Sequence, residues 1–377
     1  MDRVYLDFNA TSPLAASVTR WLAKGEFFWA NPASQHGSGK AARARLDEAS
    51  DAIARSFGTT HRLHFHSGVT EAVNTWAAGL APGALFAYAP TDHSCVRAQV
   101  ERLERQGHPC LALPVDHNGE LRLDEAIAQL QQRMPAAGAW VNWTWVQNET
   151  GVVWPLKDAV QLQAATGVRV HVDAAQAPGK VEGWNQLSPE LDAYSFSAHK
   201  FGALKGVGFT FVHPQTTWVP LLKGGGQQGG LRAGTENPMG AWSVKLALED
   251  LTRDARPAET LTLMSQVRRE LDGWLVGKGE RIAAGARQLN CNTALFVVHP
   301  LRSDMALPLF DLAGLELSMG SACGSGTAKA SHVLEVLGHE KWARHGLRLS
   351  LPWAFTAEDW AKWAPRLAQV FEKLKKS

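Results

Sequence analysis

The amino-acid sequence predicts an α/β fold, with a mainly parallel sheet in a large domain and a smaller α+β domain after it. Between about residues 36 and 250, helical patterns alternate with short apolar segments, which is the order of βαβ units. Residues 255–275 form one long amphipathic helical pattern, and the strand-like segments beyond it interleave with further helices. We therefore expect a large domain at residues 15–255 and a small domain made of residues 1–14 and 256–377.

The first long helix is predicted by apolar residues that recur with a 3.6-residue period. They are Ala42, Leu46, Ala49, Ile53 and Phe57, and Gly58 is placed to end the helix. The strands expected in the large domain are residues 63–67, 83–89, 138–146, 168–174, 193–198 and 206–212. Those expected in the small domain are residues 291–298 and 345–351.

Composition and charge exclude several classes of protein. A formal net charge of +2 over 377 residues, with no long basic segment, provides no field that would attract nucleic acid or an anionic membrane. Asp2, Arg3 and Asp7 interrupt the apolar stretch that a secretory signal needs, and polar residues, glycine and proline break the most apolar stretch, residues 72–90. The four cysteines form no CxxC pair, which disfavours a metal ribbon or disulfide framework and favours the cytoplasm.

Three polar clusters fall where expected strands end, the place where ligands gather in sheets of this kind. In HSGVTEAVN (66–74), Gly68 allows a tight turn and Thr70 offers a hydroxyl at the start of a helix, which is a ready phosphate site. In HVDAAQ (171–176), Asp173 ends an apolar segment, where a carboxylate requires a cationic partner. In SFSAHK (195–200), Lys200 lies near a strand end, where desolvation makes an amine nucleophilic toward an aldehyde.

Each cluster also has an ordinary structural explanation. A serine or threonine with glycine before a helix is usually a cap, a buried aspartate is often in a salt bridge, and a single lysine is usually on the surface. The combination is more specific than its members. A phosphate cradle, a carboxylate for a ring nitrogen and a lysine for an aldehyde are together what pyridoxal phosphate requires of a protein.

Ten ordered motifs then show that the chain resembles the cysteine desulfurases of the class V, fold-type I aminotransferase superfamily over nearly its whole length. The motifs are YLDFNATSPL (5–14), NPASQHGSG (31–39), SGVTEAVN (67–74), DHSCV (92–96), VQNETG (146–151), HVDAAQAPGK (171–180), SFSAHK (195–200), GGGQQGGLRAGTEN (224–237), GSACGSG (320–326) and LRLSL (347–351). The resemblance implies a seven-stranded, mainly parallel sheet between two helical layers, with pyridoxal phosphate as cofactor and L-cysteine as substrate. It also implies the subgroup with a long cysteine loop, which passes sulfur to an acceptor protein for iron–sulfur cluster assembly or thiolation.

The resemblance assigns roles around the cofactor ring. Lys200 would bind the cofactor covalently, and Asp173 would hold the proton on the ring nitrogen. Gln176 would donate a hydrogen bond to the phenolic oxygen, His93 would stack on the ring and help to move protons, and Asn148 would contact the ring oxygen or the substrate carboxylate.

The resemblance also assigns the phosphate and carboxylate sites. The phosphate would be bound by Val69 through its backbone and by Thr70, Ser197 and His199. Thr235 would reach the phosphate of the neighbouring subunit, which implies a homodimer. Arg348 would bind the substrate carboxylate in a fork.

A desulfurase also needs a nucleophilic thiol on an accessible segment, and Cys323 is the best candidate. It lies in SMGSACGSGTAKAS (318–331), a stretch too rich in glycine and serine to form a core. Cys110 and Cys291 adjoin strand-like segments and are interpreted as packing residues, whereas Cys95, two residues after His93, is expected near the cofactor without a required role.

The sequence departs from the family pattern at a few places. Gln228 and Gly229 replace an acidic–basic pair, residues 202–204 replace a Tyr-Gly-Pro-like stretch, and Val69 is bulkier than usual. These changes leave the cofactor residues intact, but they bear on the contacts at the dimer side and on the acceptor.

Other functions stay open from the sequence. A selenocysteine lyase would use nearly the same site, whereas another class V aminotransferase would not need Cys323. A metal site at His61, His64 and His66 is disfavoured because no further ligand cluster is evident, so no metal is predicted. A catalytically inactive scaffold that binds partners through its tryptophan-rich surface is the non-enzyme alternative.

Overall fold

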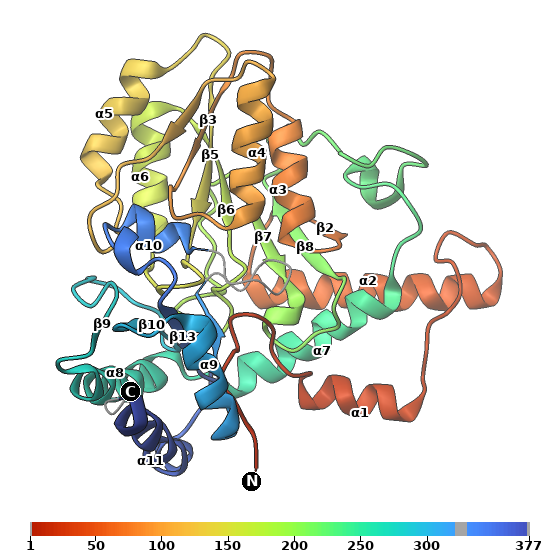
Figure 1. The fold of residues 1–377 in the computed structure, drawn as a ribbon. Coiled ribbons are helices and arrows are strands. Elements are labelled where there is room, and N and C mark those ends of the chain that lie inside the picture. The colour runs from red at the N-terminus through yellow and green to blue at the C-terminus, as the bar shows by residue number, and fades with distance from the viewer. Residues whose placement is uncertain (1, 321–329, 375–377) are drawn as a thin grey trace.

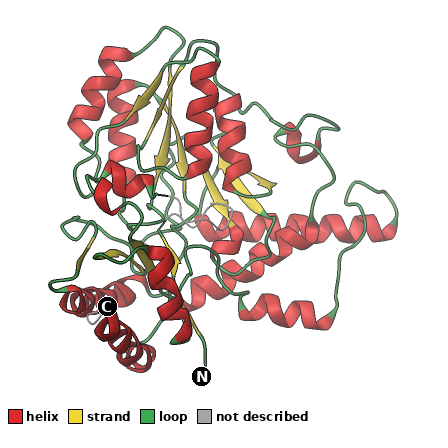
Figure 2. Ribbon diagram, in the orientation of Figure 1, coloured by secondary structure: helices red, strands yellow, loops and turns green. Residues whose placement is uncertain are grey.

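The structure is a computed structural model that describes residues 2–320 and 330–374. Its centre is a seven-stranded sheet with helices on both faces (Figures 1 and 2). The strands lie in the order β2 (Arg62–His66), β8 (Gly208–Val212), β7 (Ala193–Ser197), β6 (Arg169–Asp173), β5 (Ala139–Thr144), β3 (Leu85–Tyr88) and β4 (Cys110–Ala112). All neighbouring pairs from β7 to β4 are parallel, and only β8 runs against both of its neighbours. The predicted fold class is confirmed.

Helices cover the two faces of this sheet unequally. One face packs against α3 (Val69–Ala78) and α4 (Ser94–Arg105). The other packs against α2 (Gly37–Phe57), α5 (Leu123–Arg133), α6 (Leu156–Thr166) and α7 (Pro238–Asp254). Side chains alternate accordingly along the strands: Phe86 joins the α3–α4 side, whereas Leu85 and Ala87 join the other. The remaining helix of this part is α1 (Ala16–Lys24), which lies beside α7.

The start and end of α2 follow the predicted local signals. Its buried residues include all five members of the predicted periodic set, and Gly58 ends the helix in a left-handed conformation with φ of 54°. Its backbone N–H donates to the carbonyl of Arg55, which satisfies one of the last free carbonyls of the helix.

A second, four-stranded sheet lies beside the first and is largely antiparallel. Its order is β12 (Ser318–Met319), β13 (Gly346–Ser350), β10 (Thr293–Val298) and β9 (Gly279–Arg281). The short strands β1 (Val4–Tyr5) and β11 (Leu315–Glu316) pair next to it. The helices here are α8 (Pro257–Leu275), α9 (Ser303–Leu312), α10 (His332–Val336) and α11 (Ala357–Leu374).

Strand β10 shares its side chains between two hydrophobic cores. Ala294, Phe296 and Val298 join a core made only of residues from 1–14 and 256–377, whereas Leu295 and Val297 face the core of the large sheet. The connecting helix predicted at 255–275 is present as α8, which begins at Pro257, a residue suited to the first helical turn. The domain boundaries themselves stay a prediction.

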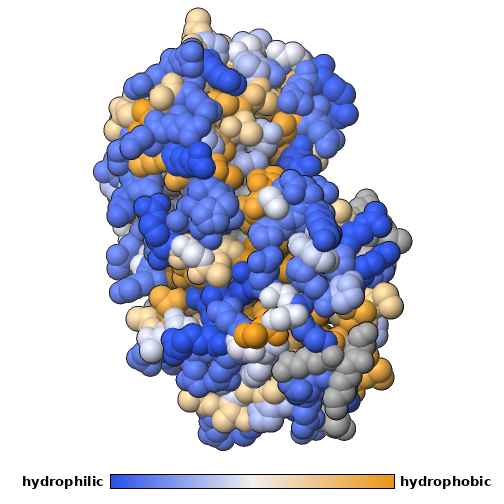
Figure 3. Space-filling view, turned by 60° about the vertical axis from the view of Figure 1, so that its left-hand side comes forward, coloured by the Kyte–Doolittle hydropathy of each residue, from blue (hydrophilic) through white to orange (hydrophobic). Residues whose placement is uncertain are grey.

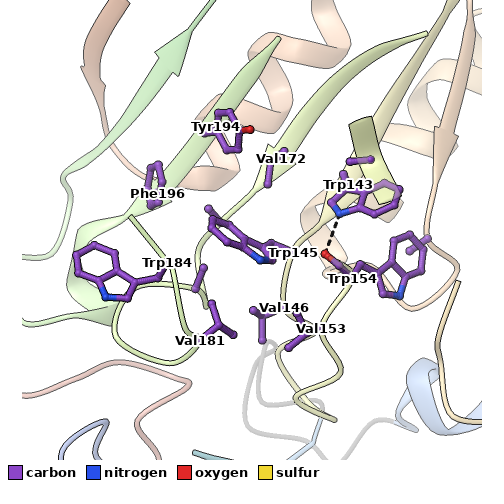
Figure 4. Packing of buried hydrophobic residues seen from close by; sticks show 14 of the residues in the cluster. Trp143, Trp145, Val146, Val153, Trp154, Val172, Val181, Trp184, Tyr194 and Phe196 are labelled. Atoms are coloured by element: carbon purple, nitrogen blue, oxygen red, sulfur yellow. Dashed lines mark hydrogen bonds between the residues drawn. The ribbon is translucent and has the colours of Figure 1, made fainter. Parts of the chain in front are cut away.

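Tryptophans fill much of the core near the carboxyl ends of the strands (Figure 4). Trp143 and Trp145 are buried, and the indole N–H of Trp143 donates to the carbonyl of Trp154 at 3.1 Å. Both are part of the hydrophobic core, as expected for large aromatic side chains whose N–H finds an acceptor. The face of the molecule in Figure 3 is mainly hydrophilic, with small apolar areas between the polar side chains. Among the described residues, no helix has the length and apolar character needed to span a membrane.

A chain of buried hydrogen bonds crosses the sheet behind the strand ends. The backbone N–H of Gly68 donates to Nδ1 of His66, so Nε2 of this neutral ring donates onward, at 2.8 Å to Thr210 Oγ1. The chain continues through Ser195 Oγ to His171 Nε2, and from His171 Nδ1 to Asn142 Oδ1. Asn142 then donates to the carboxylate of Asp92 at 3.1 Å.

The three histidines that the sequence analysis considered for metal binding have other contacts. Only His66 belongs to this chain of hydrogen bonds, and Nε2 of His61 lies 2.8 Å from the carbonyl oxygen of Leu191. His66 is engaged with Thr210, and His64 packs against Trp218 with ring centroids 5.1 Å apart. Within residues 2–320 and 330–374, no group of three His, Cys, Asp or Glu side chains is arranged to hold a metal ion.

Replacing His171 by asparagine is expected to reduce the pH dependence of stability. Burial lowers the pKa of His171 to about 3, so below pH 6.5 the unfolded chain binds a proton that the folded protein does not. The free energy of unfolding of the wild type therefore falls as the pH drops from 6.5 toward 3, with this residue contributing about 1.4 kcal/mol per pH unit. At pH 7 the variant should be about 1–3 kcal/mol less stable, because the hydrogen-bond chain is interrupted.

The measurement is urea unfolding at a series of pH values, with both proteins saturated by the same cofactor. The difference in free energy of unfolding between the wild type and His171→Asn should become smaller below pH 6.5. Exposed His117 gives the matched control, His117→Asn. Parallel curves for the wild type and His171→Asn would contradict the assignment of a neutral, buried His171.

Candidate active site

One cavity of about 540 Å³ lies at the carboxyl ends of the parallel strands, a size typical of sites for small ligands. Among the described residues, all those that the sequence analysis assigned to the site line this cavity except Thr235. The lining residues among them are Val69, Thr70, His93, Asn148, Asp173, Gln176, Ser197, His199, Lys200 and Arg348. They lie at the carboxyl ends of five strands of the large sheet or in the segments directly after them, except Arg348, which lies on β13 of the small sheet.

The side chain of Lys200 is half-buried and held by backbone carbonyls. Lys200 follows β7 in a short 3₁₀ turn, and its Nζ donates to the carbonyl oxygens of Asn9 at 2.5 Å and Ala10 at 2.8 Å. Asn9 and Ala10 belong to the N-terminal segment, so residues about 190 positions away in the sequence hold the amine in place. The amine therefore has a defined position on the cavity wall.

Asp173 is a buried carboxylate, and the charge of Lys200 only partly offsets the cost of ionising it. It is 8% exposed at the end of β6, and its Oδ1 accepts the backbone N–H of Ala175 at 3.0 Å. Among the described residues no lysine or arginine forms an ion pair with it, and burial raises its pKa to about 6. Such a carboxylate is costly to ionise unless a cation from a ligand pairs with it.

The loop between β2 and α3 forms a small anion-binding cradle. Gly68 has φ of 148°, which favours glycine, and the backbone N–H of Val69 at the start of α3 donates to Ser197 Oγ at 2.9 Å. A Cβ on Gly208 would lie 2.5 Å from the carbonyl oxygen of Phe196 and 2.8 Å from Gly68 Cα, so the backbones approach too closely for a side chain. The N-terminus of a helix, with hydroxyl groups beside it, is suited to a phosphate.

His93 and Cys95 form a close pair on the cavity wall. His93 is the N-cap of α4, and its Nδ1 accepts the backbone N–H of Cys95 at 3.2 Å and lies 3.1 Å from Cys95 Sγ. Burial, followed by the charge of Lys200, lowers the pKa of His93 to about 4. His93 is therefore a neutral ring at physiological pH, and burial raises the pKa of the Cys95 thiol.

Arg348 contributes a guanidinium group to the cavity wall. It is 2% exposed on β13, and its Nη2 donates to Asp7 Oδ1 at 2.7 Å and Ser318 Oγ at 2.9 Å. Its Nη1 donates to the carbonyl of Asn148 at 3.1 Å. Asp7 and Asn148 thus orient the guanidinium, whose five N–H donors suit a carboxylate ligand.

Several lining or neighbouring residues were missed in the sequence analysis. Asn9, Thr144, Glu149 and His332 line the cavity, and buried Asp92 bonds to Thr144 beneath it. Burial raises the pKa of Asp92 to about 7 and that of Glu149 above its usual range. Three of these five lie in segments that carried the resemblance, so the motifs YLDFNATSPL, DHSCV and VQNETG were the available signal for Asn9, Asp92 and Glu149.

Thr235 and Cys323 are the two predicted site residues that are not among the lining residues described above, for different reasons. Thr235 is exposed and does not line the cavity of its own subunit. Cys323 lies outside the described residues. Gly320 and Ala330, the described residues on either side of 321–329, both line the cavity.

Gln228, one of the departures from the family pattern, stabilises the edge of the large sheet. It has a positive φ of 52°, and its side-chain amide donates to the carbonyl of Phe65 at 2.9 Å and accepts the backbone N–H of the same residue. The amide thereby pairs with the free edge of β2, which would otherwise present open hydrogen-bonding groups.

Comparison with known proteins identifies the class to which this fold and site belong. The family model described as "Aminotransferase class-V" matches residues 4–362. The chain belongs to the class-V aminotransferase family, and the sequence-based assignment is confirmed.

Particular relatives are cysteine desulfurases. The chain is 34% identical to "Cysteine desulfurase" of Cereibacter sphaeroides, covering 95% of this chain and 93% of that protein. It is 32% identical to "Cysteine desulfurase" of Enterobacter agglomerans, covering 97% and 91%. A solved structure, "NIFS-LIKE PROTEIN", superimposes with a TM-score of 0.84 at 27% identity over 100% of both chains.

Family membership implies pyridoxal phosphate, and the residues present fit that group. Asp173 offers a buried carboxylate that forms no ion pair within the described part of the chain, which suits a protonated ring nitrogen. The Gly68–Val69 turn offers a helix N-terminus with the Ser197 hydroxyl beside it, which suits a phosphate, and Lys200 offers an amine on the same cavity wall.

Replacing Asp173 by asparagine is expected to lower the kcat of the pyridoxal-phosphate-dependent reaction by about 10²-fold or more. The amide cannot stabilise a proton on the ring nitrogen, so the ring loses its capacity to withdraw electrons. Asp173→Asn should still bind the cofactor through Lys200 and the phosphate cradle, with an altered visible spectrum. The measurement is kcat together with the absorbance spectrum, and Asp158→Asn on α6 is the matched control. Full turnover in Asp173→Asn would contradict the assignment.

Proposed function

We propose that the protein is a pyridoxal-phosphate-dependent cysteine desulfurase, which converts L-cysteine to L-alanine and leaves the sulfur as a persulfide on Cys323. The full-length similarity to cysteine desulfurases supports this activity. The observation that carries the proposal is the single cavity in which Lys200, Asp173 and Arg348 meet. A covalent anchor, a ring-nitrogen partner and a carboxylate-binding group are what an amino acid substrate and this cofactor require together.

The roles proposed for the residues follow their positions. Lys200 binds the cofactor aldehyde and Asp173 pairs with the ring nitrogen, while Gln176 donates to the phenolic oxygen. The phosphate is bound by the Val69 backbone, Thr70, Ser197 and His199. Burial lowers the pKa of His199 to about 4 without a ligand, and the negative charge of a bound phosphate would raise it.

At the substrate end, Arg348 binds the carboxylate of L-cysteine and Asn148 orients it. Neutral His93, whose pKa is lowered by burial, stacks beside the ring and accepts or returns a proton. The cofactor, when bound, supplies an electron sink for the charge left at Cα of the substrate.

Lys200 and Cys323 carry out the proposed proton and sulfur transfers. The Lys200 amine takes the proton from Cα of the substrate. The thiolate of Cys323 attacks the substrate sulfur: a sulfur–sulfur bond forms, the Cβ–sulfur bond breaks, and the electron pair of that bond stays with the carbon skeleton. Protonation of that skeleton releases L-alanine, so one thiol and one cysteine give one persulfide and one alanine with no external oxidant or reductant.

The other cysteines support the choice of Cys323. Burial raises the pKa of Cys95, of Cys110 to about 11 and of Cys291 to about 12. A thiol must be deprotonated to be a nucleophile, so none of these three described cysteines is activated. Cys323 is the remaining thiol, and the chain enters and leaves its segment at the cavity wall.

The proposed assembly is a homodimer in the cytoplasm that delivers sulfur to an acceptor protein. Exposed Thr235 would contact the phosphate of the partner subunit. Two loops that extend from the same side of the molecule in Figure 1 carry exposed apolar residues, which a partner would cover. Trp29 is 81% exposed in one loop, and Val219, Leu221 and Leu222 are exposed in the other. Neither nucleic acid nor membrane is a proposed partner.

The first test is the absorbance spectrum of the purified protein before and after addition of L-cysteine. Alanine and sulfide are assayed with a dithiol reductant present, which reduces the persulfide and releases its outer sulfur as sulfide. A visible band that changes with cysteine, followed by alanine and sulfide in equal amounts, is expected. A band with neither product would favour a selenocysteine lyase or another class V aminotransferase, and selenocysteine as substrate separates these two. No band after addition of the cofactor would leave the inactive scaffold.

A further inference from the structure

Lys180 is a buried lysine to which neither the sequence motifs nor the proposed reaction assign a role. It is 1% exposed, at the end of the HVDAAQAPGK motif. Its Nζ donates to Gln176 Oε1 at 2.5 Å and to Asn9 Oδ1 at 3.1 Å. Both acceptors are uncharged amides, and among the described residues no carboxylate forms an ion pair with this amine.

Its surroundings fix the orientation of the Gln176 amide. Oε1 of Gln176 faces the Lys180 amine, and Nε2 donates to the backbone carbonyl of Asn9 at 2.9 Å. If the amide were reversed, Nε2 would face a donor and Oε1 would face an acceptor, and both hydrogen bonds would be lost. The amide can therefore adopt only one of its two orientations while Lys180 is present.

Asn9 connects this pair to Lys200. The carbonyl oxygen of Asn9 accepts from both Gln176 Nε2 and Lys200 Nζ. The Asn9 side chain is itself fixed, because its Nδ2 donates to the carbonyl of Asn148 at 3.1 Å and its Oδ1 accepts from Lys180. Gln176 and Asn9 both line the cavity. The second N–H of the Gln176 amide is thus a donor that remains for a ligand in the cavity.

We propose that Lys180 is a positioning residue that holds Gln176 with its N–H group toward the cavity, so that Gln176 can only donate to the oxygen of the ligand bound there. This inference rests on the proposed cofactor, whose phenolic oxygen carries negative charge and needs a donor. Lys180 itself touches neither substrate nor cofactor, because Gln176 and Asn9 take up its amine.

The test is a pH titration of the visible band of the holoenzyme. The measured quantity is the midpoint, the pH at which the band is halfway between the protonated and the deprotonated form of the bound cofactor. A hydrogen-bond donor to the anionic phenolic oxygen stabilises the deprotonated form of the bound cofactor. Loss of that donor therefore raises the pH of this midpoint. Lys180→Met removes the group that orients Gln176 and should raise the midpoint by about one pH unit. Gln176→Ala removes the donor itself and should raise it by a similar amount.

A double-mutant cycle separates positioning from a direct effect of charge. The charges that face Lys180 are those of Lys200, Arg348 and Asp7, and the thiol of Cys291 lies nearby. Removal of a cationic Lys180 would also raise the midpoint through Lys200, but this effect would persist without Gln176. If Lys180 acts through Gln176, Lys180→Met should cause no further shift in the Gln176→Ala background. Shifts that add in the double variant would overturn the proposal.

A second variant keeps the proposal testable if Lys180→Met does not fold. Gln176→Glu keeps an acceptor for Lys180 but replaces the N–H toward the cavity by an oxygen, so the midpoint should rise by more than it does in Gln176→Ala. An unchanged midpoint in Gln176→Glu would overturn the proposal. A wild-type protein without a visible band after addition of pyridoxal phosphate would instead contradict the proposed function.

Discussion

Replacing Lys200 by alanine is expected to lower desulfurase turnover by at least about 10³-fold. The amine is held by the carbonyls of Asn9 and Ala10 on the cavity wall, and it has two proposed tasks: it binds the cofactor and takes the Cα proton. Alanine removes both the nucleophile and the base. The absorbance of a covalently bound cofactor should disappear, although Asp173 and the phosphate cradle still provide non-covalent binding.

The measurements are kcat for alanine release and the visible spectrum after dialysis. Lys205→Ala is the matched control, because Lys205 lies five residues further on and is exposed. It should keep both the band and the activity. A Lys200→Ala variant that keeps the dialysis-resistant visible band would show that another amine anchors the cofactor, and buried Lys180 would be the first to test.

The sequence could predict the large sheet and most of the cavity for a physical reason. Strands buried on both faces are continuous apolar segments, and polar residues directly after them can only meet at the carboxyl edge of a parallel sheet. Asp173, Lys200 and Thr70 are recognisable in this way, and the structure places all three on one cavity.

The groups that support these residues could not be predicted in the same way. Asn9 is one polar residue in an N-terminal segment, and its bonds to Asn148 and Thr293 join positions 139 and 284 residues apart in the sequence. Lys180 follows proline and glycine, a context typical of an exposed turn, but it is buried because two amide oxygens replace its hydration. Contacts of this kind depend on how distant segments meet, which local patterns do not encode.

The same limit applies to Gln228. Gln228 stands where the family has a charged residue, and the sequence analysis connected this change with the dimer side. In the structure, however, its side chain pairs with the edge of β2 within the subunit. A residue with positive φ that forms strand-like hydrogen bonds through its side chain has no periodic signature. Its contact to Phe65 is a property of the fold, and effects on the acceptor have to be sought elsewhere.

Replacing Cys323 by serine is expected to abolish sulfide and alanine release while the cofactor chemistry upstream is kept. Serine has no thiolate, so no persulfide can form, and the loss should be at least about 10²–10³-fold. Addition of L-cysteine should still change the visible band, because Lys200, Asp173 and Arg348 are intact. Proton exchange at Cα of the substrate, followed in deuterated water, should also continue, because Cys323 has no proposed part in that step and Lys200 and Asp173 are unchanged.

Cys110→Ser is the matched control, because it removes a half-buried thiol whose pKa burial raises to about 11. It should release alanine and sulfide at the wild-type rate. If Cys323→Ser kept full turnover while Cys110→Ser or Cys95→Ser lost it, the persulfide would form on a described cysteine. Cys95 would then be the stronger candidate, because it already lies on the cavity wall.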